Sequence, residues 1–344
     1  MSHNLHLNEQ TGKYSFYSVR EKAWHGLGHI ADNYESSAEV VKKSGLDFTV
    51  AKEPNIHRIP GGQEIISTSS FYTYRTDTLD ILGDKLGAEY HVVQNVEAFS
   101  FFDAIAGENG IYYETAGALG KGEQIFITAK LPGYIQVGKD DLIEKYLFLT
   151  NSHAGRTSVI AAFTPVRIVC NNTLNAALEG MSNTIAIKHT QNASLELREA
   201  HQIMGMINKL SPLYEQAFNA WANIPMDDAD LKRFIQVAVA PNKEALEHLR
   251  SGKEDEASAI YRGMVDTILE YAFCSPTQQM DTTRGTLFGA YNTITGFYQN
   301  LRNFKDNKAK IKSIFYSGIA QTRTQDAFRL CEQFAKIGTR ALDI

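Results

Sequence analysis

The sequence has little of the chemistry that marks secreted or membrane proteins. Three cysteines in 344 residues, Cys170, Cys274 and Cys331, are too few and too scattered for a disulfide framework. No apolar run approaches the roughly 20 residues that span a bilayer. The start of the chain has no basic flank followed by an apolar stretch, so we expect no secretory signal. We therefore predict a cytoplasmic protein that does not enter a membrane.

An excess of positive charge is also lacking, because the formal net charge is -5. It is unevenly spread: residues 193–280 carry 8 Lys/Arg against 13 Asp/Glu, whereas residues 281–344 carry 10 against 5. A basic C-terminal segment suits a polyanionic partner, but a solvated helix face has the same composition. The net negative charge argues against a dedicated DNA-binding protein, since such proteins are usually basic.

Motifs for a metal or a cofactor are lacking. His25-Gly-Leu-Gly-His29 has an i, i+4 spacing, which aligns two imidazoles only on a helix, and its two glycines oppose a helix. Gly117-Ala-Leu-Gly-Lys-Gly122 is too short for a phosphate loop and predicts a hairpin turn instead. We predict neither a metal nor a cofactor.

The pattern of apolar residues predicts an α+β protein. The expected fold has a mostly antiparallel N-terminal sheet with short helices, followed by a C-terminal helical layer. We divide the chain into an N-terminal arm with a short helix (1–45), a β-rich α+β domain (46–192) and a helical domain (193–344). In the arm, Ser36 and Ser37 are candidate caps for a helix at 38–43 that Gly45 ends.

Individual elements follow from period and turn chemistry. Strands are expected at 46–50, 71–74, 134–137, 166–169 and 185–187, with Pro132-Gly133 as a turn, and hairpins at 111–117/124–131 and 146–150/157–163. Asn95 is the expected cap of a helix at 95–105. After residue 192 the pattern is helical, and Pro212 is expected to interrupt the first helix there. Other helices are predicted at about 172–179, 242–251, 254–273, 284–302, 306–316 and 322–339.

The stretch 284–302 combines three glycines with aromatic and basic side chains. Glycine inside a helix costs about 1 kcal/mol relative to alanine, so Gly285, Gly289 and Gly296 suggest close approach of a backbone or a ligand. Aromatic residues between basic ones can bind single-stranded nucleic acid, but tightly packed core tyrosines give the same pattern. We favour the core for Tyr291 and name Tyr298 as a stacking candidate.

Three motifs carry a resemblance that extends along the chain. They are Trp24-His25-Gly26-Leu27-Gly28, Thr164-Pro-Val-Arg-Ile-Val-Cys-Asn-Asn-Thr-Leu174 with Cys170, Asn171 and Asn172, and Gly285-Thr-Leu-Phe-Gly-Ala-Tyr-Asn292 with Gly289. Together they resemble the phage/plasmid-like proteins, also called domain-of-unknown-function family 932. Many members end the late motif with Glu-Tyr-Val-Asp-His, whereas this chain has Gly296-Phe-Tyr-Gln-Asn300. The resemblance implies an origin on mobile elements and no established catalytic residues.

These observations lead to one main hypothesis and two rivals. The main one is a non-enzymatic nucleic-acid-binding protein of a mobile element that handles single-stranded DNA in replication or recombination, with a homo-oligomer left open. Its expected contacts are Arg156, Arg167, Lys188, Arg284, Tyr298, Arg302 and Lys305.

The first rival is an enzyme acting on a nucleotide or another small molecule. Its pocket would hold Cys170, Asn171, Asn172, His153 and Arg167, although no local signature supplies a base or an oxyanion donor. The second rival is a structural or host-interaction protein. Whether the chain is an enzyme is therefore open, and we lean against it.

Overall fold

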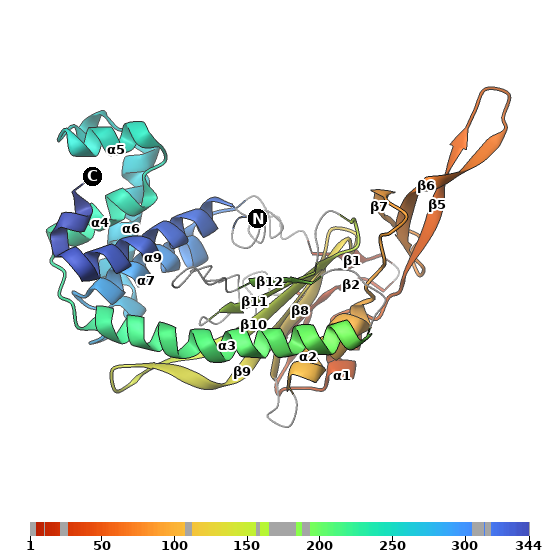
Figure 1. Cartoon of the computed structure of the whole chain (residues 1–344), viewed down its shortest axis with the longest axis horizontal. Helices are drawn as coiled ribbons and strands as arrows, with labels where there is room; N and C mark the ends of the chain where they lie inside the picture. The colour runs from red at the N-terminus through yellow and green to blue at the C-terminus, as the bar shows by residue number, and fades with distance from the viewer. Residues whose placement is uncertain are drawn as a thin grey trace.

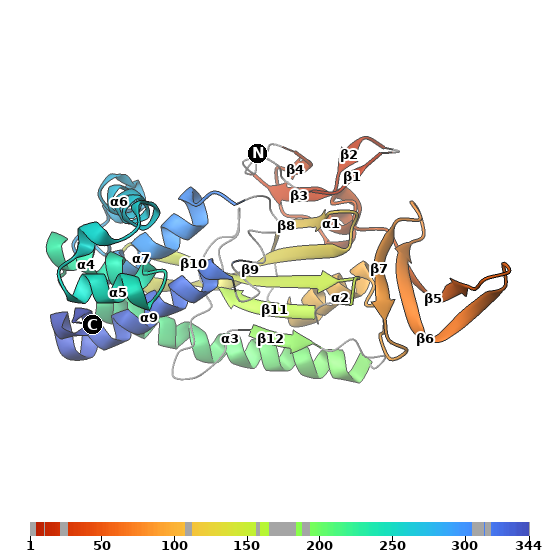
Figure 2. The same ribbon diagram turned by 90° about the horizontal axis from the view of Figure 1, so that it is seen from above.

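The computed structural model describes residues 5–9, 11–20, 27–106, 112–155, 159–164, 184–187, 193–304, 313 and 318–343. Figure 1 and Figure 2 show an elongated molecule with a large sheet in the middle, helices at one end and a smaller sheet at the other. The predicted α+β class, with an N-terminal antiparallel sheet and C-terminal helices, is confirmed. Within the described ranges, no helix is long and apolar enough to cross a membrane.

The central sheet has seven strands, and both of its faces are buried along most of its middle strands. The strands are β3 (Phe16–Val19), β4 (His29–Ala31), β8 (Tyr112–Leu119), β9 (Gln124–Val137), β10 (Asp141–Ser152), β11 (Val159–Thr164) and β12 (Thr184–Ile187). Their order in space is β12-β11-β10-β9-β8-β3-β4. Neighbours pair antiparallel except for β3 and β4, which are parallel.

The N-terminal arm is more ordered than the sequence suggests. A small hairpin of β1 (Leu7–Asn8) and β2 (Lys13–Tyr14) precedes β3, and β3 pairs with β8 through Phe16↔Gly117. The sequence patterns predicted no strands in this arm. Strand β3 has only four residues and pairs with β8, about 100 residues away, which local periodicity cannot reveal.

The two hairpins predicted from turn residues and alternation are confirmed. Strands β8 and β9 pair from Tyr112↔Lys130 to Leu119↔Gln124, and β10 pairs with β11 from Tyr146↔Thr164 to Thr150↔Ile160. The turn predicted at Pro132-Gly133 was wrong, because β9 runs through it with a shift in register opposite Lys145. A bulge of this kind bends a strand without ending it.

Beyond that bulge, the β9–β10 hairpin reaches the helical layer. The amide of Gly138 donates to Asn219 Oδ1 at 2.9 Å, and Asn219 Nδ2 donates to the carbonyl of Gln136 at 2.6 Å. Thr282 Oγ1 donates to Asp141 Oδ2 at 2.6 Å. These bonds fix the tip of the hairpin against helix α3 and against the turn that precedes α7.

The smaller sheet consists of β5 (Val50–Arg58), β6 (Glu64–Arg75) and β7 (Ile81–Leu86) in the order β5-β6-β7. The distal part of β5 and β6 projects away from the rest of the molecule (Figure 1), and we call residues 54–66 the arm tip. The predicted strand at 46–50 begins only at Val50, while Leu46 and Phe48 are buried before it.

Two short helices pack near the base of this sheet. Helix α1 (Ser37–Lys43) begins at a capping box in which Ser36 accepts from the Glu39 amide, and Gly45 follows its end with a φ of +66°. Helix α2 (Asn95–Ala106) lies at the predicted place, but Asn95 does not cap it. Its side chain instead donates to the carbonyl of Leu46 at 3.0 Å, and the Gln94 amide donates to Glu97.

The helical layer comprises α3 (Ala193–Ala222), α4 (Asp228–Val239), α5 (Lys243–Arg250), α6 (Ala259–Cys274), α7 (Leu287–Gly296), a π-helix (Phe297–Leu301) and α9 (Ile319–Ile337). Short 3-10 turns occupy Glu254–Glu256, Pro276–Gln278 and Gly338–Leu342. Helix α3 continues through Pro212, so the predicted interruption was wrong. Buried Leu210 and Tyr214 on either side hold the helix in place despite the missing backbone donor.

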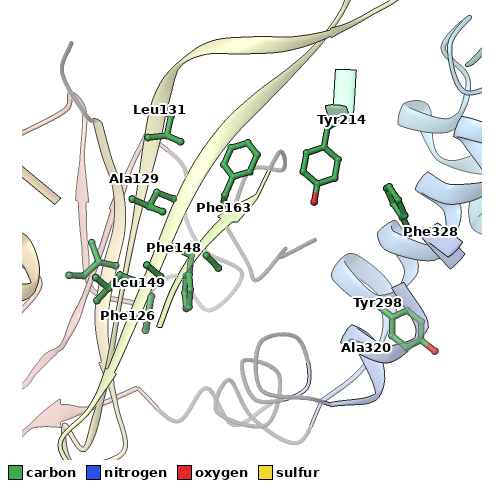
Figure 3. Packing of buried hydrophobic residues seen from close by; sticks show 14 of the residues in the cluster. Phe126, Ala129, Leu131, Phe148, Leu149, Phe163, Tyr214, Tyr298, Ala320 and Phe328 are labelled. Carbon is green, nitrogen blue, oxygen red and sulfur yellow. The ribbon is translucent and has the colours of Figure 1, made fainter. Parts of the chain in front are cut away.

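One hydrophobic core joins the sheet to the helices. Tyr214 on α3 lies between Phe163 on β11 and Phe328 on α9, with ring centroids 6.1 and 6.2 Å apart (Figure 3). Helix α3 also packs against β9 and α2 along the sheet. The described residues thus form a continuous apolar core, and the domain boundaries at 45 and 192 stay predictions.

Three expected elements lie wholly or largely outside the described residues: the strand at 166–169 and the helices at about 172–179 and 306–316. The helix predicted at 254–273 is divided into the 3-10 turn and α6. The one predicted at 284–302 starts at Leu287 and changes to a π-helix at Phe297.

Candidate functional site

Many of the residues singled out in the sequence lie outside the described part of the chain. These are Trp24, His25, Gly26, Arg156, Arg167, Cys170, Asn171, Asn172, Lys188 and Lys305. The structure does place Gly28, Arg284, Gly289, Asn292, Tyr298 and Arg302. The site is therefore built from α7, the π-helix and the elements that contact them.

The two described arginines of the prediction lie at opposite ends of one helical stretch. Arg284 precedes α7 and Arg302 follows the π-helix, so the helical stretch between them separates the two by about 20 Å. Arg284 is exposed and makes no ion pair within the described residues. It lines a cavity of about 390 Å³ with Asp228 and Thr286. A single nucleotide phosphate cannot contact both arginines.

Tyr298 is buried, with 1% of its surface exposed. A stacking contact with a base needs an accessible ring, so the role predicted for Tyr298 does not fit this structure. Burial raises the pKa of its hydroxyl, and the positive charges of Arg302 and Arg323 partly oppose that rise. Tyr291 is likewise buried, as expected for a core residue.

Two arginines, Arg302 and Arg323, lie close enough to Tyr298 to act on its hydroxyl, and a third, Arg329, shares Asp326 with Arg323. The Cζ atom of Arg302 lies 5.2 Å from the Tyr298 ring centroid and 5.6 Å from that of Phe304, both within cation–π range. Arg323 and Arg329 on α9 each donate to Asp326, at 3.2 and 3.3 Å. We call Arg302, Arg323 and Arg329 the arginine cluster. Because Arg323 and Arg329 share the single carboxylate of Asp326, the three arginines together carry more positive than negative charge.

Two buried polar atoms at the arginine cluster have no hydrogen-bond partner within the described residues. They are Nε of Arg323 and the hydroxyl of Tyr298, whose pKa the nearby Arg302 helps to lower against the effect of burial. Most buried polar atoms in native proteins are paired, and an unpaired donor costs about 1–3 kcal/mol. An anionic oxygen entering here would find donors already in place. The sequence could suggest Arg302, but not that Arg323 and Arg329 join it from another helix.

A second feature is a cleft between the β9–β10 hairpin and α7, which we call the hairpin cleft. Its volume is about 390 Å³. One wall includes Asp141, Leu142 and Glu144 of β10, and the other includes Asn292 and Gln299. Asn292 of the late motif thus lines this cleft, and the helix that carries it continues as a π-helix from Phe297. Single turns of π-helix are frequent at functional sites.

The motif glycines have structural explanations. A Cβ on Gly289 would lie 1.7 Å from the Thr283 carbonyl oxygen, which confirms the expected close approach of another backbone. Gly28 has a φ of +88°, and a Cβ there would lie 2.4 Å from the Phe16 carbonyl oxygen. Gly285 lies before α7 rather than in it and has a φ of +65°.

One residue of the rival enzymatic pocket, His153, lies in the described part of the chain. His153 is fully buried, and its Nε2 lies 2.8 Å from Asn95 Oδ1, while its carbonyl accepts from Thr73. It belongs to the junction between α2 and the two sheets. Among the described residues, no group of three or more His, Cys, Asp or Glu side chains could hold a metal ion.

Sequence reasoning missed a second buried polar group at this junction. Arg75 is 2% exposed and forms a bidentate pair with Asp77, at 2.9 and 2.6 Å. Its guanidinium lies over the Phe48 ring, with Cζ 3.8 Å from the ring centroid. With its charge neutralised by Asp77 and its face covered by Phe48, Arg75 has a structural role.

The comparison with protein families agrees with the motifs. The model for a domain of unknown function, DUF932, matches residues 84–315, which is more than half of the chain. The chain belongs to the DUF932 family. No curated protein and no solved structure matches it.

The DUF932 match covers both walls of the hairpin cleft and the central and late motifs. The first motif, at 24–28, precedes the matched segment. In the arginine cluster, Arg302 lies inside the match, whereas Arg323 and Arg329 follow it.

Proposed function

We propose that this DUF932 protein binds single-stranded nucleic acid through the arginine cluster, as a non-enzymatic DNA-handling protein of a mobile element. The observation that carries the proposal is the combination of two guanidinium groups on Asp326, a third over the Tyr298 ring, and two buried, unpartnered polar atoms. Arginine is well suited to phosphate because its planar fork donates in two directions.

A preference for single strands follows from the groups beside the cluster. Phe304 is a half-buried aromatic side chain next to Arg302. Gln299, which lines the hairpin cleft, precedes Arg302 by less than one helical turn. Unpaired bases can reach aromatic faces and pockets, whereas stacked bases in a duplex cannot. A cytoplasmic location and a homo-oligomer belong to the same proposal, and light scattering on the same samples tests the oligomer.

The test is fluorescence anisotropy of labelled single- and double-stranded oligonucleotides across a salt series. Arg329 is a suitable probe because its side chain is 64% exposed, so Arg329→Gln should leave the fold intact. The matched control is Arg250→Gln on α5, which is 61% exposed and also pairs with an acid three residues away.

We expect salt-dependent binding that prefers single strands. Arg329→Gln should weaken it several-fold and reduce the slope of log affinity against log salt by about 1, whereas Arg250→Gln should change neither. The absence of binding at low salt overturns the proposed function. Equal losses in both variants would show unspecific attraction and would remove the arginine cluster as the site.

A further inference from the structure

The hairpin cleft has features that the arginine cluster does not use. It is a cavity of about 390 Å³, within the range of small-molecule sites, and it is lined by side chains from β10, α6 and α7. Phe288 and Asn292 are four residues apart on α7, and Gln299 follows on the π-helix, so the helical stretch presents one continuous wall.

Amide side chains on this wall are available for a ligand. Asn292 and Gln299 are half-buried, and their side chains make no hydrogen bond within the described residues. Gln278, 4% exposed, accepts from Thr293 through Oε1, while its Nε2 has no described partner. An amide both donates and accepts, so the three together can match a ligand edge with mixed donors and acceptors.

The charges of the cleft select against anions. None of the described lining residues is Lys or Arg, and both carboxylates are engaged: Asp141 by Thr282, and Glu144 by Lys130 and Tyr146. Lys130 offsets the charge of Glu144, but no described cation is paired with Asp141 and the described lining offers a phosphate no cation of its own. The cleft therefore favours an uncharged ligand.

Apolar and aromatic groups complete the walls. Tyr271 lines the cleft and packs so closely on Gly296 that a Cβ there would lie 2.4 Å from its ring. Leu142, 51% exposed, offers an apolar surface from the β10 side, and Phe288 lies at the base of α7. A planar ligand with apolar faces and polar edges fits such walls better than a sugar, which has hydroxyl groups all around.

We propose that the hairpin cleft binds an uncharged nucleobase, either in a free nucleoside or as an unpaired base of a nucleic-acid strand. The free-nucleoside form goes beyond the function proposed above, and the strand form rests on it. In both forms, Asn292, Gln299 and Gln278 recognise the edge of the base, and Tyr271 and Leu142 contact its faces.

The experiment is ligand-observed NMR followed by calorimetry with the full chain and four nucleosides, with ribose and glucose as neutral sugar probes. The variants are Asn292→Ala and Gln299→Ala. Gln325→Ala, a half-buried glutamine of α9 outside the cleft, is the matched control. Thermal unfolding of each variant checks that the fold is retained, and Arg329→Gln is measured in parallel.

We expect at least one nucleoside to bind and the cleft variants to weaken its affinity about tenfold. Gln325→Ala and Arg329→Gln should bind it as the parent does. If no nucleoside binds and oligonucleotide affinity is also insensitive to Asn292→Ala and Gln299→Ala, the inference is wrong, even if Arg329→Gln supports the proposed function. Sugar binding without nucleoside binding overturns the free-nucleoside form. Nucleoside binding without oligonucleotide binding upholds the free form and overturns the proposed function alone.

Discussion

The Nη1 atom of Arg75 lies 2.7 Å from Nε2 of His6, joining the first described residues of the chain to the smaller sheet. His6 is buried, with 4% of its surface exposed. Burial is the main cause that lowers the pKa of His6 below 6.5, and the positive charge of Arg75 lowers it further. The neutral imidazole therefore accepts the hydrogen bond from Arg75.

This contact predicts a loss of stability in mild acid. Because the folded-state pKa lies below the unfolded value of 6.5, the unfolded chain binds the proton first as the pH falls. The contribution of His6 is complete above pH 6.5 and decreases below it. Guanidinium unfolding at pH 7.5 and 5.5 should show a smaller pH dependence for His6→Gln than for the parent. An equal dependence in both would refute the role of His6.

Asn95 should be among the costlier polar residues to replace. It is 1% exposed, donates to the Leu46 carbonyl at 3.0 Å and bonds His153 at 2.8 Å. Asn95→Ala leaves these buried partners unpaired and should cost about 3 kcal/mol in urea unfolding. The control Asn55→Ala, in the more exposed arm tip, should cost less than about 1 kcal/mol. Similar values for the two variants would contradict this assignment.

Two glycines in helices should respond to alanine in opposite directions. Gly289→Ala would place a methyl group against the Thr283 carbonyl and should destabilise the protein by about 2–3 kcal/mol. Gly205→Ala on α3 meets nothing within 4 Å and should stabilise it by up to about 1 kcal/mol. Thermal and chemical unfolding of both variants tests this. A neutral Gly289→Ala would mean that the 283–289 segment relaxes freely.

The arm tip should contribute little to the stability of the core. Ile56 and Ile66 face each other across the hairpin and are 58% and 63% exposed. We expect the double change of both to threonine to alter the free energy of unfolding by less than about 1 kcal/mol. The same change at Ile135, which is fully buried on β9, should cost about 2 kcal/mol or more. A large loss of unfolding free energy in the double variant would contradict this prediction and show that the arm tip packs against other residues.

The sequence predicted best where local chemistry decides the structure. The hairpins of the central sheet follow from alternation and from glycines such as Gly120 and Gly122, which adopt positive φ in the turn. The Ser36 cap is equally local. In both cases, a few neighbouring residues determine the conformation.

Prediction failed where distant contacts override local preference. Pro212 would end an isolated helix, but buried neighbours on α3 keep it intact. A tyrosine close to Arg302 in the sequence can face either solvent or the core. Tyr298 is buried because it belongs to the same apolar cluster as residues of α9, which are distant in the sequence. The union of Arg302 with Arg323 and Arg329 depends on two helices meeting in space, which no spacing in the sequence encodes.

The projecting arm also bears on how copies of this chain can approach one another. An exposed two-stranded ribbon offers open backbone edges, which are the usual template for strand addition and fibre growth. Here Pro54 removes one donor from the outer strand, and the ladder shifts register between Pro54 and Ile56. These two irregularities interrupt the outer edge of β5, so strand addition along that edge is disfavoured.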